Sequence, residues 1–551
     1  MVSRLVEDRR LRRFLTGLAL GALLGGCTKV GTQSAGTHNP GTIPGEVRIA
    51  IQSEPKNLNP ILASNTTDGM TDALVFDFLV TADPKGNPLP DLANPVPTLE
   101  NGGISRDGLT ITYHLRRNVK WSDGAPFTSK DVKFSWQAVM NKANNTTSRR
   151  GYDLVQSVDT PDPYTVVFHM KQKFAPVVNT LFAESDNPIW VVPEHILGKY
   201  PDINEVPFNN QPIGTGPFKV AEWVKGDHIT FARNDGYFMG KPKLDRIVVH
   251  VIPDENTTIN ELKTHDIDYM FQASPDTCKE LQGISGVNLT FNSVDGYESV
   301  LLNLAHPPLD DPRVRKAIAY AINKKELVDK LTCGTQKVAT EDHPDFMWAH
   351  NPNVTLYDYN PEKAKALLQA AGYTPGPNGL VFKNGHGISL LGVTNTTNIT
   401  RRQLSVLVQA ELRAVGIDMA IKNYPGAQLF APAGEGGILQ LGKFDLSFSG
   451  WYAGVDPDDS SQFICAMFPP GGYNYTRYCK KAMDAAQQDA LTHLDQASRT
   501  TAYYKIENLL ADDVPQIFFW WIRQQQPINS DLKGFDPNPA TETWNAYQWS
   551  I

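Results

Sequence analysis

The sequence predicts an α/β protein that folds as two or three domains. Segments with the pattern of strands alternate with segments with the pattern of helices along most of the chain, which is typical of α/β architecture. The chain has 551 residues, of which 41% are hydrophobic and 20% charged, an ordinary globular composition. Because single hydrophobic cores stop growing near roughly 250–300 residues, a chain of this length is expected to divide into domains.

The individual elements follow from apolar periodicity and from start and stop signals. Short apolar runs predict strands at 47–51, 109–115, 165–170, 228–231, 247–252, 299–303, 388–393 and 446–449. Longer segments predict helices at 129–140, 311–322, 361–371, 402–414, 478–491 and 496–512. Ser129 followed by Asp131 marks the start of one helix. Asn360 and Pro361 mark the start of another, and Gly372 marks its end.

The N-terminal segment has the pattern of an export signal. An apolar run over residues 14–26 follows five arginines: Arg4, Arg9, Arg10, Arg12 and Arg13. The run is far shorter than the roughly 20 residues of a membrane-spanning helix, so residues 1–26 are interpreted as a signal peptide. The following Cys27 resembles the acylated cysteine of a bacterial lipobox, and two acyl chains on it would give stable membrane anchoring. Residues 27–44, rich in Gly, Thr and Pro, are expected to form a flexible tether.

The charge of the chain argues against nucleic acid as a partner. The formal net charge is -8, and residues 1–26 carry five Arg against Glu7 and Asp8, so the remainder is more acidic still. An acidic surface repels phosphate backbones and anionic lipid headgroups. The chain is therefore expected to bind no nucleic acid, and to reach the membrane only through its lipid.

The cysteines that follow Cys27 favour disulfides over a metal site. No two of Cys278, Cys333, Cys465 and Cys479 form the C-x-x-C pair of zinc or thioredoxin-like sites. An even number of cysteines in an exported protein is typical of disulfides. Cys465 and Cys479, which are close in sequence, are the first predicted pair, and Cys278 with Cys333 is the second.

Several segments carry a resemblance to one protein family. Residues 101–136 (NGGISRDGLTITYHLRRNVKWSDGAPFTSKDVKFSW) resemble the signature segment of the bacterial extracellular solute-binding proteins of family 5. This family comprises oligopeptide-, dipeptide-, nickel- and related binding proteins of ABC importers. Further segments agree with the family pattern in the same order along the chain: 54–60, 212–218, 234–245, 303–323, 359–373 and 451–458.

The resemblance implies a fold of the periplasmic-binding-protein type II kind, with two lobes that close on a ligand and an extra inserted domain. Carried onto this chain, domain I takes 45–66, 206–294 and 523–551, domain II (the insertion) takes 67–205, and domain III takes 295–522. Domains I and III form the two lobes and close about a hinge. The implied function is capture of a small ligand, without a cofactor and as a monomer, for delivery to the transmembrane subunits of an ABC permease.

The common catalytic motifs are absent from the sequence. There is no H-E-x-x-H, no G-x-S-x-G and no Walker A motif. Gly214 and Gly216 are interpreted as a backbone crossing between lobes, because the segment lacks the remaining residues of a phosphate loop. Asp456, Asp458 and Asp459 are interpreted as turn residues rather than as a metal site. We therefore expect neither catalysis nor a metal site, although a secreted lipid-anchored hydrolase remains the alternative from another class.

The expected cleft wall combines aromatic and charged side chains. A closing cleft needs aromatic contact area and a few orienting polar groups. By resemblance, Trp451 and Tyr452, just after strand 446–449, and Tyr297, just before strand 299–303, match wall positions of the family. Other candidate wall residues are Glu54, at the end of the first strand, and three residues where the chain returns to domain I: Trp520, Trp521 and Arg523.

Gly454 marks a departure from the peptide-binding members of the family. Those relatives have at this position an Asp whose charge holds the α-ammonium of the ligand. A buried ammonium without a partner costs several kcal/mol. Either Asp456 or Glu54 supplies the charge here, or the ligand has no free amino terminus. Peptides are the first expectation, and oligosaccharides, other small polar solutes and metal chelates stay open, although the twelve His include no clustered pair that suits a direct nickel site.

Overall fold

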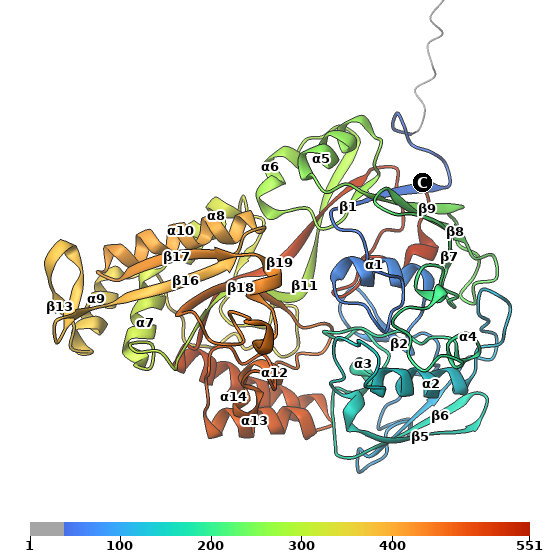
Figure 1. Ribbon diagram of the computed structural model, residues 1–551, viewed down its shortest axis with the longest axis horizontal. Helices are drawn as coiled ribbons and strands as arrows, with labels where there is room; N and C mark the ends of the chain where they lie inside the picture. The colour runs from blue at the N-terminus through green and yellow to red at the C-terminus, as the bar shows by residue number, and fades with distance from the viewer. Residues whose placement is uncertain (1–37) are drawn as a thin grey trace, which may run out of the picture. The chain divides into compact units, whose positions relative to one another are not determined.

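A mixed β-sheet of eleven strands organises the protein, whose computed structural model describes residues 38–551 (Figure 1). The predicted signal peptide, Cys27 and most of the predicted tether lie outside the described residues. The strands lie in the order β17 (Asp418–Tyr424), β16 (Ser389–Asn395), β18 (Leu446–Tyr452), β11 (Val287–Leu302), β19 (Gln516–Asn529), β10 (Tyr269–Met270), β1 (Glu46–Ile51), β9 (Arg246–Val251), β8 (His228–Arg233) and β7 (Phe218–Val224), and β12 (Lys337–Val338) pairs with β19.

The two longest strands, β11 and β19, belong to both halves of this sheet. Residues 287–293 of β11 pair with 523–529 of β19 on the side where β10 and β1 follow. Residues 297–301 pair with 516–521 on the side where β18 follows, and the ladder is irregular between Ser293 and Tyr297. We call the part built on β1 and β7–β10 lobe 1, and the part built on β16–β18 lobe 2.

Each lobe has its own hydrophobic core. In lobe 1, Val47 and Ile49 of β1 belong to a large buried cluster. In lobe 2, Val300 of β11 and Phe448 of β18 belong to a second buried cluster, which includes Leu404. Because the cores are separate, the two paired strands between them are where a hinge movement would act.

The region that was predicted to be an insertion has a sheet of its own. It contains the antiparallel strands β4 (Thr110–His114), β6 (Thr165–Met170) and β5 (Val155–Asp162), with α2 (Ser129–Met140) packed against them (Figure 1). Its core residues Val132 and Phe168 belong to the same buried cluster as Val47 of lobe 1. The inserted region therefore packs on lobe 1 without a separate core, and its boundaries as domain II remain a prediction.

Helices cover the sheets of both lobes. Besides α2, the helices of eight residues or more are α1 (Thr66–Val75), α5 (Glu255–Thr264), α7 (Pro312–Ala321), α8 (Lys324–Leu331), α9 (Pro361–Ala370), α10 (Ile399–Ala414), α13 (Lys481–Thr492) and α14 (Gln496–Asp513). In lobe 2, α7 packs against α9, and α13 packs against α14. As predicted, α9 begins after Asn360, and Gly372, which follows it, has a φ of +94°.

α2 begins at Ser129, as predicted. Thr128, not Ser129, is the N-cap, and its backbone N–H donates to Asp131 Oδ2 at 2.8 Å. The Ser129 hydroxyl instead donates to the carbonyl oxygen of Asp162 at 2.7 Å. Asp131 thus closes a capping box with Thr128, while Ser129 fixes the helix to the end of β5.

Some strands extend beyond their predicted bounds, β11 and β18 among them. β11 begins at Val287 rather than at 299, and β18 ends at Tyr452 rather than at 449. Residues 287–292 (VNLTFN) alternate apolar and polar side chains, a strand pattern that the prediction missed, whereas 294–298 and 450–452 follow no such alternation. Their backbone groups pair across β11, β18 and β19, so tertiary pairing sets these strand lengths.

Two disulfides join the cysteine pairs that were named from the sequence. Cys465 pairs with Cys479 within lobe 2, and Cys278 pairs with Cys333. Cys278 begins the short helix α6 (Cys278–Leu281) of lobe 1, whereas Cys333 follows α8 of lobe 2. The second pair therefore cross-links the two lobes beside the strands that connect them.

Gly214 and Gly216 lie where the inserted region returns to lobe 1 at β7. The Gly216 N–H donates to the carbonyl oxygen of Val75 at 2.8 Å, and the Gly214 carbonyl oxygen accepts from Ser122 N–H at 2.8 Å. A Cβ atom added to Gly214 would overlap that Val75 carbonyl oxygen. The sequence placed this crossing between the lobes, but it joins the inserted region to lobe 1.

We predict that Gly214→Ala lowers the free energy of unfolding by about 1–3 kcal/mol, because the methyl group forces the Val75 backbone to shift. Denaturant unfolding followed by circular dichroism measures the change. Gly434→Ala is the matched control, since a Cβ atom there meets nothing within 4 Å. Equal unfolding midpoints for both variants would show that the crossing is not tightly packed.

Candidate ligand-binding site

Strand pairing brings together aromatic residues that are far apart in the sequence. Tyr297 of β11 lies opposite Trp451 of β18 on one side and Trp521 of β19 on the other. Tyr297 and Trp521 are buried in one small cluster, and Trp451 packs against it. The Tyr297 hydroxyl donates to Gln462 Oε1 at 2.9 Å. The predicted wall residues Tyr297 and Trp451 are therefore true neighbours.

A pocket of about 560 Å³ lies beside Trp451, and we call it the aromatic pocket. Its lining includes Tyr297, Phe430, Trp451, Gln462, Tyr473 and Gln516, and no charged side chain lines it. Trp451 Nε1, Gln462 Nε2 and Gln516 Oε1 are buried and have no hydrogen-bond partner among the described residues. The aromatic pocket thus offers neutral hydrogen-bonding groups beside aromatic rings.

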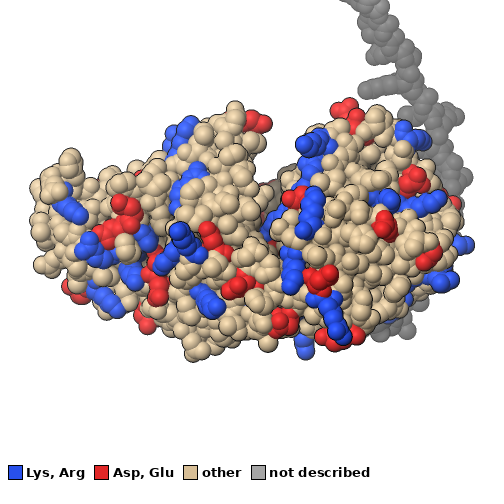
Figure 2. All heavy atoms as spheres, turned by 90° about the horizontal axis from the view of Figure 1, so that it is seen from below, with Lys and Arg blue, Asp and Glu red and all other residues tan. Residues whose placement is uncertain are grey.

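A second cavity, of about 250 Å³, lies where lobe 1, the inserted region and lobe 2 meet. Its walls come from residues before and within α1, from the inserted region and from the ends of the lobe-connecting strands; they include Ser64, Asn65, Ser185, Asp186, Asp295, Tyr452, Gly454, Gln524 and Glu542. A third cavity, of about 200 Å³, shares Gln272, Tyr452 and Gln524 with it. We treat these two cavities as one interlobe cleft. The surface view shows a deep notch in the molecule (Figure 2).

One end of the interlobe cleft is acidic. Asp186, Asp295 and Glu542 line the cavity of 250 Å³, and no Lys, Arg or His among the described residues lines it. Asp186 pairs with Arg150 at 3.2 Å, but Asp295 Oδ2 is buried without a hydrogen-bond partner. Burial raises the pKa of Asp295, and it raises the pKa of Glu542 to about 7. A ligand cation would favour the ionised forms of these two carboxyl groups.

The other end of the cleft carries arginines. Arg401 and Glu298 form a bidentate pair with nitrogen–oxygen distances of 2.7 and 2.8 Å. Arg523 forms no ion pair within residues 38–551; its Nη1 donates to the carbonyl oxygen of Thr335 at 3.0 Å. Arg523 therefore keeps a charge available for a ligand anion.

The backbone of β18 is open along one edge. β18 pairs with β11 over its whole length, but it pairs with β16 only through Leu446 and Ser447. The neighbouring residues Gly450 and Trp451 line the aromatic pocket, and Tyr452 lines the interlobe cleft with an exposed fraction of 43%. An extended ligand could pair with the free strand edge while its side chains enter both cavities.

Of the predicted site residues, Gly454, Trp520 and Arg523 also line the interlobe cleft. Gly454 has a φ of +89° and forms a bridge with Ser185 of the inserted region. A Cβ atom there would lie 2.6 Å from the Ser185 backbone, so this close contact favours glycine. Gly454 thus serves a contact between lobe 2 and the inserted region.

The other predicted residues make contacts away from the cavities. Glu54 Oε1 accepts from Trp223 Nε1 at 2.8 Å and from the Gly226 N–H at 3.0 Å, beside β7 and β8. Trp521 is buried, and its Nε1 donates to the carbonyl oxygen of Glu341 at 2.9 Å. Neither residue lines the interlobe cleft or the aromatic pocket.

Asp456 is held by a buried arginine. Its carboxylate accepts from Arg499 of α14 at 2.6 and 2.9 Å, and both side chains are less than a tenth exposed. Asp458 pairs with Arg150, and Asp459 accepts from Gln487 at 2.8 Å. These aspartates hold the loop after β18 to distant elements, and Asp458 also accepts from the Ser460 N–H at 3.1 Å, which is the local capping that the sequence suggested.

The sequence did not reveal Asp186, Asp295, Arg401 and Glu542 as cleft residues. The two of these four residues that are nearest in sequence, Asp295 and Arg401, are 106 positions apart. Only the position of Asp295, two residues before Tyr297, offered a local signal.

Comparison with known proteins places the chain in a family. The model of the bacterial extracellular solute-binding proteins, family 5 Middle, matches residues 87–474. The chain belongs to this family. This finding confirms the predicted α/β fold and the predicted role in solute binding, and the family is one of binding proteins rather than enzymes. No helix within residues 38–551 is both long enough and apolar enough to span a membrane.

Relatives of this family 5 protein cover nearly its whole length. The oligopeptide-binding protein AppA of Bacillus subtilis is 26% identical, over 94% of this chain and 93% of its own. The dipeptide-binding protein of Escherichia coli is 27% identical, over 89% and 91%. The solved structure of NikZ from Campylobacter jejuni in complex with Ni(L-His) is 27% identical, with a TM-score of 0.79, and covers 93% of this chain and 100% of its own.

We predict that Asp456→Asn destabilises the protein by about 3–5 kcal/mol, because it leaves Arg499 buried without its partner charge. Thermal unfolding measures the loss, and ligand affinity of the folded fraction should stay within twofold. Asp489→Asn is the control, because its contact with Lys505 is exposed and 3.9 Å long. Reduced affinity with unchanged stability would assign Asp456 to the ligand instead.

Proposed function

We propose that this protein captures peptides with free ends in the interlobe cleft, as the substrate-binding component of an ABC importer. The observation that carries the proposal is the separation of charge along the cleft. Asp295 and Glu542 lie at one end, and Arg523 lies at the other. A zwitterionic ligand would place its ammonium against the acids and its carboxylate against the arginine.

The proposal accounts for the absence of an Asp at position 454. Neither Asp456 nor Glu54 replaces it, because Asp456 binds Arg499 and Glu54 binds Trp223. Asp295 and Glu542 supply negative charge to the same cavity that Gly454 lines. The site for a ligand ammonium is thus provided by other residues of the cleft wall.

The main chain and the aromatic pocket supply the remaining contacts. The free edge of β18 at Gly450–Tyr452 can form hydrogen bonds with any peptide backbone, so it gives affinity without regard to sequence. The aromatic pocket holds neutral polar atoms and the exposed rings of Phe430 and Tyr473. It suits an uncharged peptide side chain, whose burial against the rings adds contact area.

The relatives support peptides as the ligand class. AppA of Bacillus subtilis has been solved in complex with a nonapeptide, at 25% identity to this chain and a TM-score of 0.76. NikZ from Campylobacter jejuni has been solved in complex with Ni(L-His), an amino-acid chelate. A metal chelate is therefore the second candidate ligand.

The transport cycle follows from a closing hinge. Lobe 1 and lobe 2 close about β11 and β19, and the ligand stabilises the closed form because only that form contacts it on both sides. The inserted region acts as domain II and stays with lobe 1. The protein works as a monomer outside the cell membrane, held there by a diacyl anchor on Cys27 after removal of residues 1–26, and presents its ligand to the permease.

We predict that Arg523→Gln weakens binding of a peptide with a free carboxylate at least tenfold but leaves binding of the same peptide with an amidated C-terminus unchanged. Calorimetry with the free and the amidated forms of the same tripeptides measures the affinity of each variant. Mass spectrometry checks that the peptides stay intact. Arg413→Gln is the control, because Arg413 is exposed and pairs only with Asp418 at 3.5 Å and with a nearby carbonyl oxygen.

Equal losses for the free and amidated peptides would remove Arg523 from the proposed carboxylate site. Failure of the wild type to bind any peptide, together with binding of Ni(L-His), would replace peptides by chelates. Cleavage of the peptides would instead support the alternative that the protein is a secreted, lipid-anchored hydrolase.

We predict that Cys27→Ala moves the protein from the membrane fraction to the soluble exported fraction, because the thiol that carries the acyl chains is lost. Fractionation of cells with immunoblotting measures the distribution. Cys465→Ala is the control for loss of a cysteine elsewhere. Membrane retention of Cys27→Ala would contradict the lipid anchor.

A further inference from the structure

Three ionisable side chains meet inside lobe 2, beside Asp295 of the interlobe cleft. Asp342 and His343 lie in the segment that follows β12, and Glu507 lies on α14. Their exposed fractions are 1%, 2% and 0%. Since buried ionisable groups need a partner of opposite charge or a hydrogen bond, the contacts of these three residues are informative.

The three side chains bring possible ligand atoms together but make no hydrogen bond with one another. One ligand atom from each lies within 4.8 Å of the others. Both carboxylate oxygens of Asp342, both of Glu507 and both ring nitrogens of His343 have no hydrogen-bond partner among the described residues. His343 Nε2 lies 3.6 Å from Glu507 Oε1, which is too long for a hydrogen bond.

Further carboxylates surround this cluster. Asp295, Glu341 and Asp459 are each at most 2% exposed, and each has one oxygen without a hydrogen-bond partner among the described residues. The buried arginines of this region do not compensate them, since Arg499 pairs with Asp456 and Arg150 pairs with Asp458. His350 pairs with Glu341, and His343 lies 3.9 Å from Asp295 Oδ1 and 3.6 Å from Glu507 Oε1, so two histidines face five carboxyl groups in a region shielded from water.

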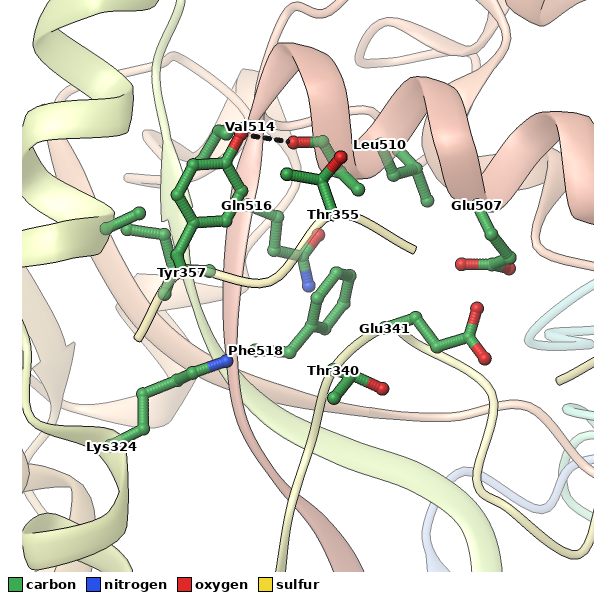
Figure 3. Close-up of a pocket in the computed structure, with 13 residues that line it drawn as sticks. Lys324, Thr340, Glu341, Thr355, Tyr357, Glu507, Leu510, Val514, Gln516 and Phe518 are labelled. Atoms are coloured by element: carbon green, nitrogen blue, oxygen red, sulfur yellow. Dashed lines mark hydrogen bonds between the residues drawn. The ribbon is translucent and has the colours of Figure 1, made fainter. Parts of the chain in front are cut away.

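A small cavity adjoins the cluster. Its volume is about 30 Å³, and Glu341 and Glu507 belong to its lining. Figure 3 shows the carboxylates of Glu341 and Glu507 facing each other at one side of this cavity, with Glu507 projecting from α14. Asp342 and His343 do not line this cavity, so it borders the cluster on the side of Glu507 only.

We propose that Asp342, His343 and Glu507 bind a divalent transition-metal ion, such as Zn²⁺ or Mn²⁺, which stabilises lobe 2. Carboxylate oxygens and an imidazole nitrogen form a donor set that these ions accept, and the imidazole disfavours Ca²⁺ and Mg²⁺, which take oxygen ligands. The ion supplies the positive charge that the cluster lacks.

The site connects the segment after β12 with α14 and lies next to the lobe-connecting strand β11. Asp295 of β11 approaches His343 Nδ1 at 3.9 Å and also lines the interlobe cleft. The sequence predicted no metal site, because Asp342 and His343 are separated from Glu507 by more than 160 positions and no ligand motif links them. Only packing of α14 brings the donors together.

The test uses the purified full chain, stripped with a chelator and dialysed. We expect calorimetry to show about one Zn²⁺ or Mn²⁺ ion per chain, elemental analysis to find the ion after gel filtration, and the added ion to raise the unfolding temperature. Asp342→Asn and Glu507→Gln should weaken the affinity at least tenfold, while the stripped variants unfold no earlier than the stripped wild type. Glu411→Gln is the matched control on α10 of lobe 2 and should bind the ion as the wild type does.

Three results would overturn the site. In the first, the wild type retains no ion. In the second, Glu507→Gln binds the ion with the same affinity as the wild type. In the third, the wild type binds Ca²⁺ but neither Zn²⁺ nor Mn²⁺. If the metal-free Asp342→Asn and Glu507→Gln variants fail to fold, His343→Gln is the remaining probe. It removes one metal ligand and leaves every carboxylate in place. An unchanged affinity in that variant would also exclude the site.

Discussion

The antiparallel pairing of β11 with β19 is the interaction on which the rest of the structure depends. These strands are the only ones among the described residues that pair within both lobes, and their ladder is irregular between Ser293 and Tyr297. The irregular segment places Asp295 in the interlobe cleft and Tyr297 between Trp451 and Trp521. A backbone link that both joins the lobes and lines the cleft lets ligand contact and lobe movement act on the same residues.

Buried charges in this protein fall into two groups. Asp456 with Arg499, and Glu298 with Arg401, are bidentate pairs that fix loops and strands in place. Asp295 has an oxygen without a partner in the cleft, and Asp342 and Glu507 have unpartnered oxygens inside lobe 2. Because a buried carboxylate without a partner is costly, the first group is explained by the fold alone, whereas the second group is the basis of the two proposed binding sites.

The local elements were largely predictable from the sequence. Helix 129–140 and strand 165–170 have the predicted bounds, because capping residues and apolar alternation act over short distances. The central part of the sheet was less predictable. β11 is 16 residues long; residues 287–292 at its start alternate apolar and polar side chains and were open to prediction, whereas residues 294–298 follow no alternation and are held at 296–298 by pairing with β18. The open edge of β18 was likewise invisible, because it depends on where β16 ends its pairing.

The sequence by itself determined the fold class, the family and the aromatic residues Trp451 and Tyr297, because motifs and large apolar side chains are local features of the chain. Tertiary structure alone decided which charges are free. It paired Asp456 with Arg499, turned Glu54 toward Trp223, and brought Glu542 into the cleft and Glu507 beside His343. The availability of a charge depends on which distant side chain lies within about 4 Å of it, and that distance exists only once the lobes have packed.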